Sequence, residues 1–140
     1  MEDVGRIKLV ADVALFVGDR VLLVKYRDTR KYDGQEGWFL PDDYLRRREH
    51  PEMGAQRILR EQVGFEVPGL KLGMIESFEG SGAWHLIFHY VGRLGVAVDF
   101  APGPNVAAAE WFPLGHLPDR SGMAHEGWAA DVIDAVRETR

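Results

Sequence analysis

The sequence predicts one α/β domain in which helices pack against a mixed β-sheet. The chain has 140 residues, which suffices for one domain with its own hydrophobic core, and we assign residues 1–140 to it. Strand-like alternation of apolar residues marks the N-terminal part and the region 69–94. Helical spacing of apolar residues follows each of these regions. This order is typical of a sheet that helices cover.

The first two strands form a predicted hairpin. In residues 6–17 every odd position is apolar, whereas Lys8 and Asp12 occupy even positions. This period of two predicts a strand with one strongly buried face. A Gly-Asp turn at 18–19 joins it to a second strand, residues 20–27.

A loop, a short strand and a helix follow the hairpin. The polar stretch 28–37 predicts a surface loop, and the apolar residues 38–40 predict a brief strand that the next proline ends. Pro51 suits the first turn of a helix that spans about residues 52–63, and Gly64 ends it. The apolar positions of this helix recur at helical spacing: Ala55, Ile58, Leu59 and Val63.

The second half of the chain repeats this pattern. Two strands, residues 69–78 and 83–94, flank a turn at 79–82. A short strand at 109–114 then precedes a C-terminal helix. The apolar stripe of this helix consists of Trp128, Val132, Ala135 and Val136.

Composition excludes several functional classes. Apolar residues make up 46% of the chain and charged residues 28%, which is typical of a globular domain. The net charge of −5 favours no contact with nucleic acid or an anionic membrane. The absence of cysteine excludes disulfides and thiolate chemistry. The N-terminal segment has no basic region and Asp12 interrupts its apolar stretch, so we expect neither a signal peptide nor a membrane span, and a cytoplasmic protein.

The region 43–65, with the leader "WFLPDD", resembles the box of the Nudix hydrolases, G-x5-E-x7-R-E-U-x-E-E-x-G-U, where U is a bulky apolar residue. The spacing is intact throughout. Six box positions carry the family residue: Glu49, Arg57, Leu59, Glu61, Gly64 and Phe65. Three depart from it, because Asp43 replaces the first glycine and Ile58 and Gln62 replace two helical glutamates. We therefore describe the box as degenerate.

The resemblance implies the Nudix-type α/β/α sandwich and cleavage of a nucleoside diphosphate-linked substrate. In the family, glutamates at positions 58, 61 and 62 share one helical face and hold Mg²⁺ or a similar ion. By resemblance, Glu61, Arg57 and Glu49 are the predicted catalytic residues. Because one of three helical carboxylates remains, we expect weak or altered hydrolysis. The alternative is a non-catalytic module that binds a nucleotide or sugar nucleotide, and a third reading is a fold reused for protein contacts, for example as a homodimer.

Other acidic residues could replace the lost ligands. Asp42 and Asp43 stand where the family has two glycines, and Glu110 lies where family members often supply a further acidic group. The metal ligands expected for Mg²⁺ or Mn²⁺ are then Glu61, Asp43 and Glu110, and an inactive protein would need no metal. The competing interpretation makes the two aspartates solvated turn residues.

Substrate contacts are predicted from basic and aromatic residues. Arginine forks bind phosphate without metal, so the run "RRR" of Arg46, Arg47 and Arg48 could hold a diphosphate, although such runs are commonly solvated. Trp38 is a candidate for stacking on a base. As in some divergent branches of the family, a histidine could act as the base, and the candidates are His85, His116 and His125.

Overall fold

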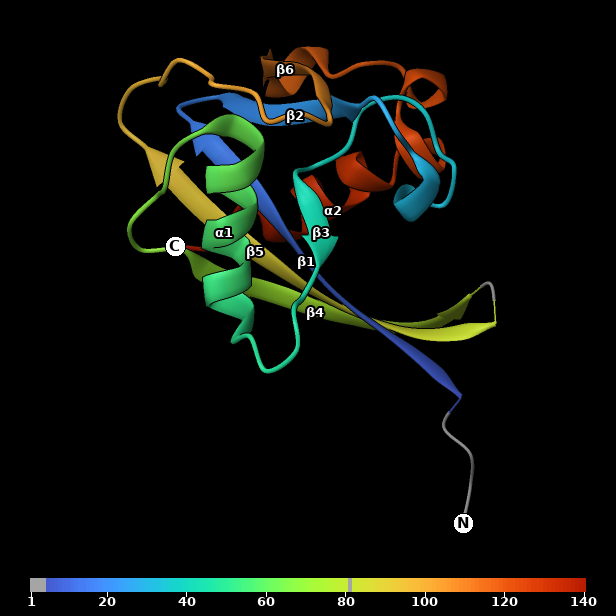
Figure 1. Ribbon diagram of the computed structural model, residues 1–140. Helices are drawn as coiled ribbons and strands as arrows, with labels where there is room; N and C mark the ends of the chain where they lie inside the picture. The colour runs from blue at the N-terminus through green and yellow to red at the C-terminus, as the bar shows by residue number, and fades with distance from the viewer. Residues whose placement is uncertain (1–4, 81) are drawn as a thin grey trace.

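The computed structural model describes residues 5–80 and 82–140, so the first residues of the predicted domain and Ser81 in the predicted turn lie outside the described residues. It contains six strands and two α-helices within these ranges (Figure 1). The strands are β1 (Arg6–Val17), β2 (Arg20–Tyr26), β3 (Asp42–Tyr44), β4 (Lys71–Gly80), β5 (Ala83–Leu94) and β6 (Val106–Pro113). The helices are α1 (Pro51–Val63) and α2 (Trp128–Val136), with single 3₁₀ turns η1 (Arg30–Tyr32), η2 (Leu114–His116), η3 (Arg120–Gly122) and η4 (Ala124–Glu126).

The strands form one mixed sheet in the order β4-β5-β1-β2-β6, and β3 also pairs with β1. The central strands β1 and β5 are parallel over their whole length, whereas the other pairs are antiparallel. The predicted hairpin of β1 and β2 is therefore confirmed, as is the mixed character of the sheet.

The two helices cover opposite faces of this sheet (Figure 1). One core cluster joins α1 to the sheet through residues such as Leu59 of α1 and Val13 of β1. The other joins α2 through residues such as Ile133 of α2 and Phe16 of β1. Apolar burial on both faces stabilises the layers, and the predicted α/β/α sandwich is confirmed.

Strand β1 differs from its predicted pattern. Residues 11–16 are buried on both faces because α1 covers one face and α2 the other. Asp12, at an expected solvent-facing position, is 1% exposed. At the N-terminal end, where β1 extends beyond the helices in Figure 1, the apolar side chains of Ile7 and Leu9 are 45% and 42% exposed. The predicted strongly buried face therefore holds at Ala11, Val13 and Leu15 and not at the N-terminal end of the strand.

The predicted brief strand at 38–40 is also displaced. Trp38 and Phe39 make only isolated bridges, and the short strand β3 lies at 42–44. Pro41 does not end the extended chain, because its carbonyl oxygen accepts a hydrogen bond from the Val13 N–H at 3.1 Å. A proline lacks the N–H that a strand interior needs, but its carbonyl can still join a strand.

The helices agree closely with prediction. α1 begins one residue earlier than expected, at Pro51, and ends at Gly64, whose φ of 90° suits glycine. In α2 the buried stripe includes Ile133, whereas the predicted member Ala135 is exposed. Among the described residues, no helix is both long and apolar enough to cross a membrane.

Candidate functional site

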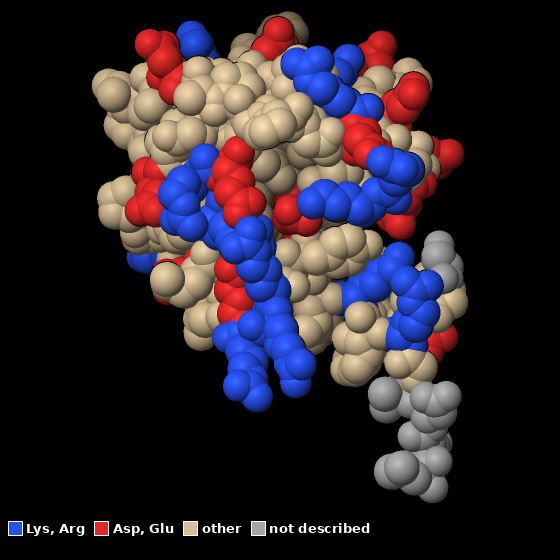
Figure 2. Space-filling model, viewed as in Figure 1, with Lys and Arg blue, Asp and Glu red and all other residues tan. Residues whose placement is uncertain are grey.

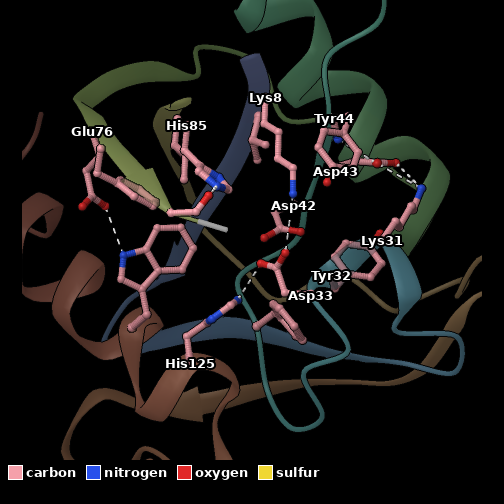
Figure 3. Close-up of a pocket in the computed structure, with 16 residues that line it drawn as sticks. Lys8, Lys31, Tyr32, Asp33, Asp42, Asp43, Tyr44, Glu76, His85 and His125 are labelled. Carbon is pink, nitrogen blue, oxygen red and sulfur yellow. Dashed lines mark hydrogen bonds and ion pairs between the residues drawn. The ribbon is translucent and has the colours of Figure 1, made fainter. Parts of the chain in front are cut away.

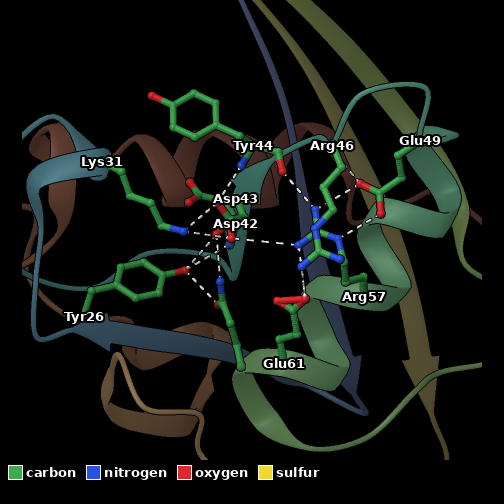
Figure 4. Close-up of polar contacts among 10 residues, drawn as sticks. Tyr26, Lys31, Asp42, Asp43, Tyr44, Arg46, Glu49, Arg57 and Glu61 are labelled. Atoms are coloured by element: carbon green, nitrogen blue, oxygen red, sulfur yellow. Dashed lines mark hydrogen bonds and ion pairs between the residues drawn. The ribbon is translucent and has the colours of Figure 1, made fainter.

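The box residues meet around the guanidinium group of Arg57, whose side chain is 5% exposed (Figure 4). Its Nε donates to Glu49 Oε2 at 2.8 Å, and its Nη2 donates to Glu49 Oε1 at 3.0 Å. Nη2 also donates to the carbonyl oxygen of Tyr44 at 2.9 Å, and Nη1 lies 3.5 Å from Glu61 Oε1. The structure thus brings the three predicted catalytic residues together, and Arg57 connects the box loop to α1.

Glu49 is fully engaged in this cluster. Its Oε1 also accepts a hydrogen bond from the Arg46 N–H at 3.0 Å. The hydrogen bonds from Arg57 are the largest cause that lowers the pKa of Glu49 below its usual range. Glu49 is therefore a charged structural partner of Arg57, and its lone pairs already have donors.

Glu61 is the more accessible carboxylate, with a side chain that is 42% exposed. Its Oε1 accepts a hydrogen bond from Arg46 Nη2 at 2.9 Å. Arg47 and Arg48 are exposed and make no ion pair with the described residues. Basic and acidic side chains lie interleaved on the face that carries α1, and basic ones project below it (Figure 2). Of the arginine run, only Arg46 joins the cluster in the described chain.

Positions 58 and 62 do not form an open face with Glu61. Ile58 is 1% exposed and belongs to the core. Gln62 is 7% exposed, and its amide group both donates and accepts a hydrogen bond. Its Nε2 donates to the Asp42 carbonyl oxygen at 2.8 Å, and its Oε1 accepts from the Tyr26 hydroxyl at 2.8 Å. A carboxylate has no N–H to donate in the first of these bonds. The need for this donor explains why position 62 carries glutamine and not glutamate.

The two aspartates of the box leader have different surroundings. Asp43 lies 3.0 Å from Lys31 Nζ and 4.0 Å from Arg57 Nη1. Asp42 is 8% exposed, so the interpretation as a solvated turn residue is wrong for it. Burial is the largest cause that raises the pKa of the Asp42 carboxyl well above its usual range, and nearby Asp12 adds to this effect.

Glu110 does not meet the box helix. In the register of β2 with β6 it pairs with Leu23, whose side chain packs in the core cluster of α2. Directly opposed residues of an antiparallel pair point to the same face. Glu110 therefore lies on the face opposite α1, although we expected it to join Glu61 in holding a metal.

The residues around the box helix do not fit a divalent metal. Their carboxylates face the cationic groups of Arg46, Arg57 and Lys31, which compete with Mg²⁺ for these oxygen atoms. In the ranges 5–80 and 82–140, no group of three or more acidic or histidine side chains is placed to hold an ion. Among the described residues, the Mg²⁺ or Mn²⁺ site implied by the family therefore has no complete set of ligands.

A cavity of about 460 Å³ opens beside the box cluster (Figure 3). Asp43 and Tyr44 belong both to β3 and to the cavity wall. Strands β1, β4 and β5 supply most of the remaining wall, and the loop that contains η1 closes one side. The wall combines apolar, aromatic and charged groups, as binding sites for small molecules commonly do.

Trp38 does not line this cavity. Its ring packs edge-on against Phe112 with centroids 4.8 Å apart, on the side of the sheet that α2 covers. Lys25 Nζ lies 4.8 Å from the Trp38 ring. Base stacking by Trp38 is therefore the wrong expectation, and the aromatic side chains of the cavity are Tyr32, Phe39, Tyr44, Phe78 and Trp128.

Two of the three candidate histidines line the cavity. The rings of His85 and Phe78 stack with centroids 4.8 Å apart and an interplanar angle of 5°. His125 Nε2 lies 3.4 Å from Asp33 Oδ2 across the cavity wall. His116 is exposed in η2 and is not part of the wall. The structure assigns neither cavity histidine a contact with the box carboxylates, so the role as base stays a prediction.

A buried hydrogen-bonded network beside the cavity was not predicted from the sequence. His89 is fully buried, and its ring nitrogens lie 2.6 Å from Asp12 Oδ1 and 2.7 Å from Glu76 Oε1. Trp128 Nε1 also donates to Glu76 Oε1 at 3.2 Å. A doubly protonated ring can donate to both carboxylates, whereas a neutral ring can donate to only one of them. Burial alone lowers the pKa of His89, but the two carboxylates outweigh it and raise that pKa above 6.5.

This network predicts that the protein loses stability as the pH rises above neutrality. A histidine whose pKa is higher in the folded state stabilises that state below its unfolded pKa, and this contribution disappears as the pH rises through the folded pKa. Each pKa unit corresponds to about 1.4 kcal/mol. Urea denaturation between pH 6 and pH 9 measures the effect. The variant His89→Gln should lose less stability over this range than the wild type, and His116→Gln should lose as much as the wild type, whereas an unchanged profile in His89→Gln would contradict the assignment.

An arginine–carboxylate cluster lies on a helix of this α/β/α sandwich, and a cavity lies beside it. This arrangement defines a Nudix-type domain. The NUDIX domain family model matches residues 6–132, and the chain belongs to this family. The resemblance seen in the box is thereby confirmed.

Solved structures share the fold. The chain is similar to a NUDIX hydrolase from Nitrosomonas europaea, with 18% identity over 94% of this chain and 89% of that one and a TM-score of 0.76. It is similar to the NUDIX domain of Shewanella oneidensis NrtR complexed with ADP ribose, with 20% identity over 94% and 86% and a TM-score of 0.76. It also resembles a C. elegans Ap4A hydrolase, with 14% identity over 93% of each chain and a TM-score of 0.66. The comparison with curated proteins gives no match.

Proposed function

We propose that the protein binds a nucleoside diphosphate derivative in the cavity beside β3 and cleaves its diphosphate slowly. The observation that carries this proposal is that the cavity and the box cluster share two residues, Asp43 and Tyr44. A nucleoside in the cavity would place its diphosphate near the basic groups of Lys31 and Arg46. The family supports a nucleotide derivative as ligand, and the structural neighbours include proteins whose names state ADP ribose and Ap4A.

Slow cleavage follows from the state of the box carboxylates. Glu61 is the exposed helical carboxylate, and Arg46 and Arg57 contact its Oε1. To take a proton from an attacking water, Glu61 would have to leave Arg46. Loss of a positioned base costs about 10² to 10⁴ in rate. We therefore place the activity well below that of an intact box.

Binding without cleavage is the second candidate function. It is favoured by the ion pair of Arg46 with Glu61, which is 2.9 Å long and lies where the resemblance expects a metal. Arginine forks hold phosphate oxygens directly, so binding of this kind needs no ion.

The proposal predicts binding in the presence of chelator. We expect isothermal titration with ADP-ribose in EDTA to give a dissociation constant close to that in millimolar MgCl₂. Arg46→Ala should weaken binding about tenfold or more, as expected for a charge-assisted hydrogen bond. Arg60→Ala is the matched control, because Arg60 is an exposed residue of α1 that pairs with Glu66. Product analysis after long incubation then separates slow hydrolysis from binding alone, and binding that vanishes in EDTA would contradict the proposal.

A further inference from the structure

Asp42 places an unpartnered carboxyl group at the wall of the cavity. The residue is 8% exposed, and no described side chain or backbone group makes a hydrogen bond with its carboxyl oxygens. Its backbone is fixed, because the Tyr26 hydroxyl accepts from its N–H at 3.0 Å and Gln62 donates to its carbonyl oxygen. The carboxyl therefore projects from a rigid support into the cavity (Figure 3).

The other carboxylates of the wall already have cationic or hydrogen-bonding partners. Asp33 lies 3.8 Å from Lys8 Nζ and 3.4 Å from His125 Nε2. Asp43 pairs with Lys31. In the described chain the Asp42 carboxyl makes no ion pair. Burial and the neighbouring aspartates raise the pKa of this carboxyl and outweigh the charge of Lys31, which lowers it.

A second unsatisfied atom lies behind Asp42. In the register of β1 with β3, Asp12 is the direct partner of Asp42, so both side chains project to the same face. Asp12 Oδ2 is buried without a hydrogen bond in the described chain, and both aspartates line a small void of about 10 Å³. Buried polar groups in proteins are almost always paired. Oδ1 of Asp12 pairs with His89, so Oδ2 is the unsatisfied atom, and the neighbouring Asp42 carboxyl faces the cavity without a hydrogen bond from the described residues. Together these two aspartates favour a positive group at this wall.

The chemistry of the wall identifies the kind of positive group. The rings of Tyr32, Phe39, Phe78 and Trp128 line the same cavity, and aromatic faces attract organic cations. A metal ion is disfavoured, since no set of three acidic or histidine side chains gathers in the described chain. One free carboxyl with aromatic neighbours suits an alkylammonium group instead.

We propose that Asp42 anchors a subsite for a positively charged nitrogen, so that the cavity takes a nucleoside diphosphate linked to a short alkylammonium group. This inference rests on the proposed function. Asp42 and Asp43 are consecutive, with Cα atoms about 3.8 Å apart. Successive side chains of a strand point to opposite faces, yet both aspartates line this cavity, so a diphosphate near Lys31, which pairs with Asp43, would share the cavity with a linked ammonium group at Asp42.

The test compares two ligands that share a nucleotide and differ in charge. CDP-choline carries a quaternary ammonium group, and CDP-glycerol carries a neutral group of similar length. Isothermal titration of both is done in EDTA, so that no metal bridges the ligand to the protein, and ADP-ribose reports the proposed function. We expect CDP-choline to bind at least about tenfold more tightly than CDP-glycerol.

The variant Asp42→Asn keeps the shape of the side chain and removes the carboxyl group that can ionise beside a cation. It should bind the two cytidine ligands equally, with the affinity for CDP-glycerol unchanged, and its melting temperature shows whether it is folded. The matched control Asp33→Asn removes an already paired carboxylate of the same wall and should keep the preference.

Every other outcome contradicts the alkylammonium subsite alone or the proposed function as well. Equal affinities in the wild type, a preference that survives in Asp42→Asn, or binding of ADP-ribose alone would overturn the alkylammonium subsite and leave the proposed function standing. Failure of all three ligands to bind would overturn both.

Discussion

Replacing Ile58 with glutamate is expected to lower the free energy of unfolding by about 3–5 kcal/mol, although it restores a residue of the family box. Ile58 is 1% exposed, so the new carboxylate would be buried in the core. Arg57 cannot neutralise it, because its guanidinium group is already engaged with Glu49 and Tyr44. An unpaired buried charge is among the most destabilising changes in a protein. Urea denaturation at pH 7 measures the loss.

The control for this prediction is Ile58→Leu, which keeps the apolar character and should cost less than about 1.5 kcal/mol. Full restoration of the helical carboxylates with Ile58→Glu and Gln62→Glu should be more damaging still. The second change removes the amide N–H that Gln62 donates to the Asp42 carbonyl oxygen. Box spacing alone predicts instead that this double variant creates or raises Mg²⁺-dependent diphosphatase activity, because the two carboxylates would join Glu61 on one helical face. A folded double variant with such activity would show that the box helix can turn these positions outward.

The fold could be predicted because its signals are local. Box spacing, the period of two in the strands and the proline and glycine at the ends of α1 all act within a few residues. The wrong predictions concern features that depend on contacts between distant parts of the chain. Burial of Asp12 depends on its pairing with His89, which lies 77 residues away in the chain. The shift of the short strand to β3 depends on its antiparallel pairing with β1, a contact between segments about 30 residues apart in the chain.

Of the candidate site, too, the parts that depend on local spacing could be predicted and the others could not. The cluster of Glu49, Arg57 and Glu61 could be predicted because box spacing fixes it. Glu110 could not be placed, since a strand alternates faces and one residue of register decides which side a carboxylate occupies. The sequence also presented Ile58 and Gln62 as losses from a metal site. The structure shows that each has a structural role, one in the core and the other in holding the backbone of Asp42.

Replacing Arg57 with methionine is expected to cost about 3–5 kcal/mol of folding stability, because it leaves a buried carboxylate without its partner. The side chain of Glu49 is 14% exposed, and Arg57 donates to both of its oxygens. The same guanidinium holds the Tyr44 carbonyl oxygen, so the variant should also loosen the segment that joins the box to the cavity. Thermal and urea denaturation measure the loss of stability, and hydrogen exchange of residues 44–49 reports the loosening.

Acid titration provides an independent check on Arg57. The pKa of Glu49 is lower in the folded state, so its pairing stabilises the protein above the unfolded pKa, and this contribution is lost as the pH falls through the folded pKa. In Arg57→Met the loss of stability between pH 5 and pH 3 should therefore be smaller than in the wild type. The control Arg46→Met removes an arginine whose side chain is 66% exposed and should cost less than about 1 kcal/mol. If both variants lost stability equally, the buried fork of Arg57 would not be what holds the box loop to α1.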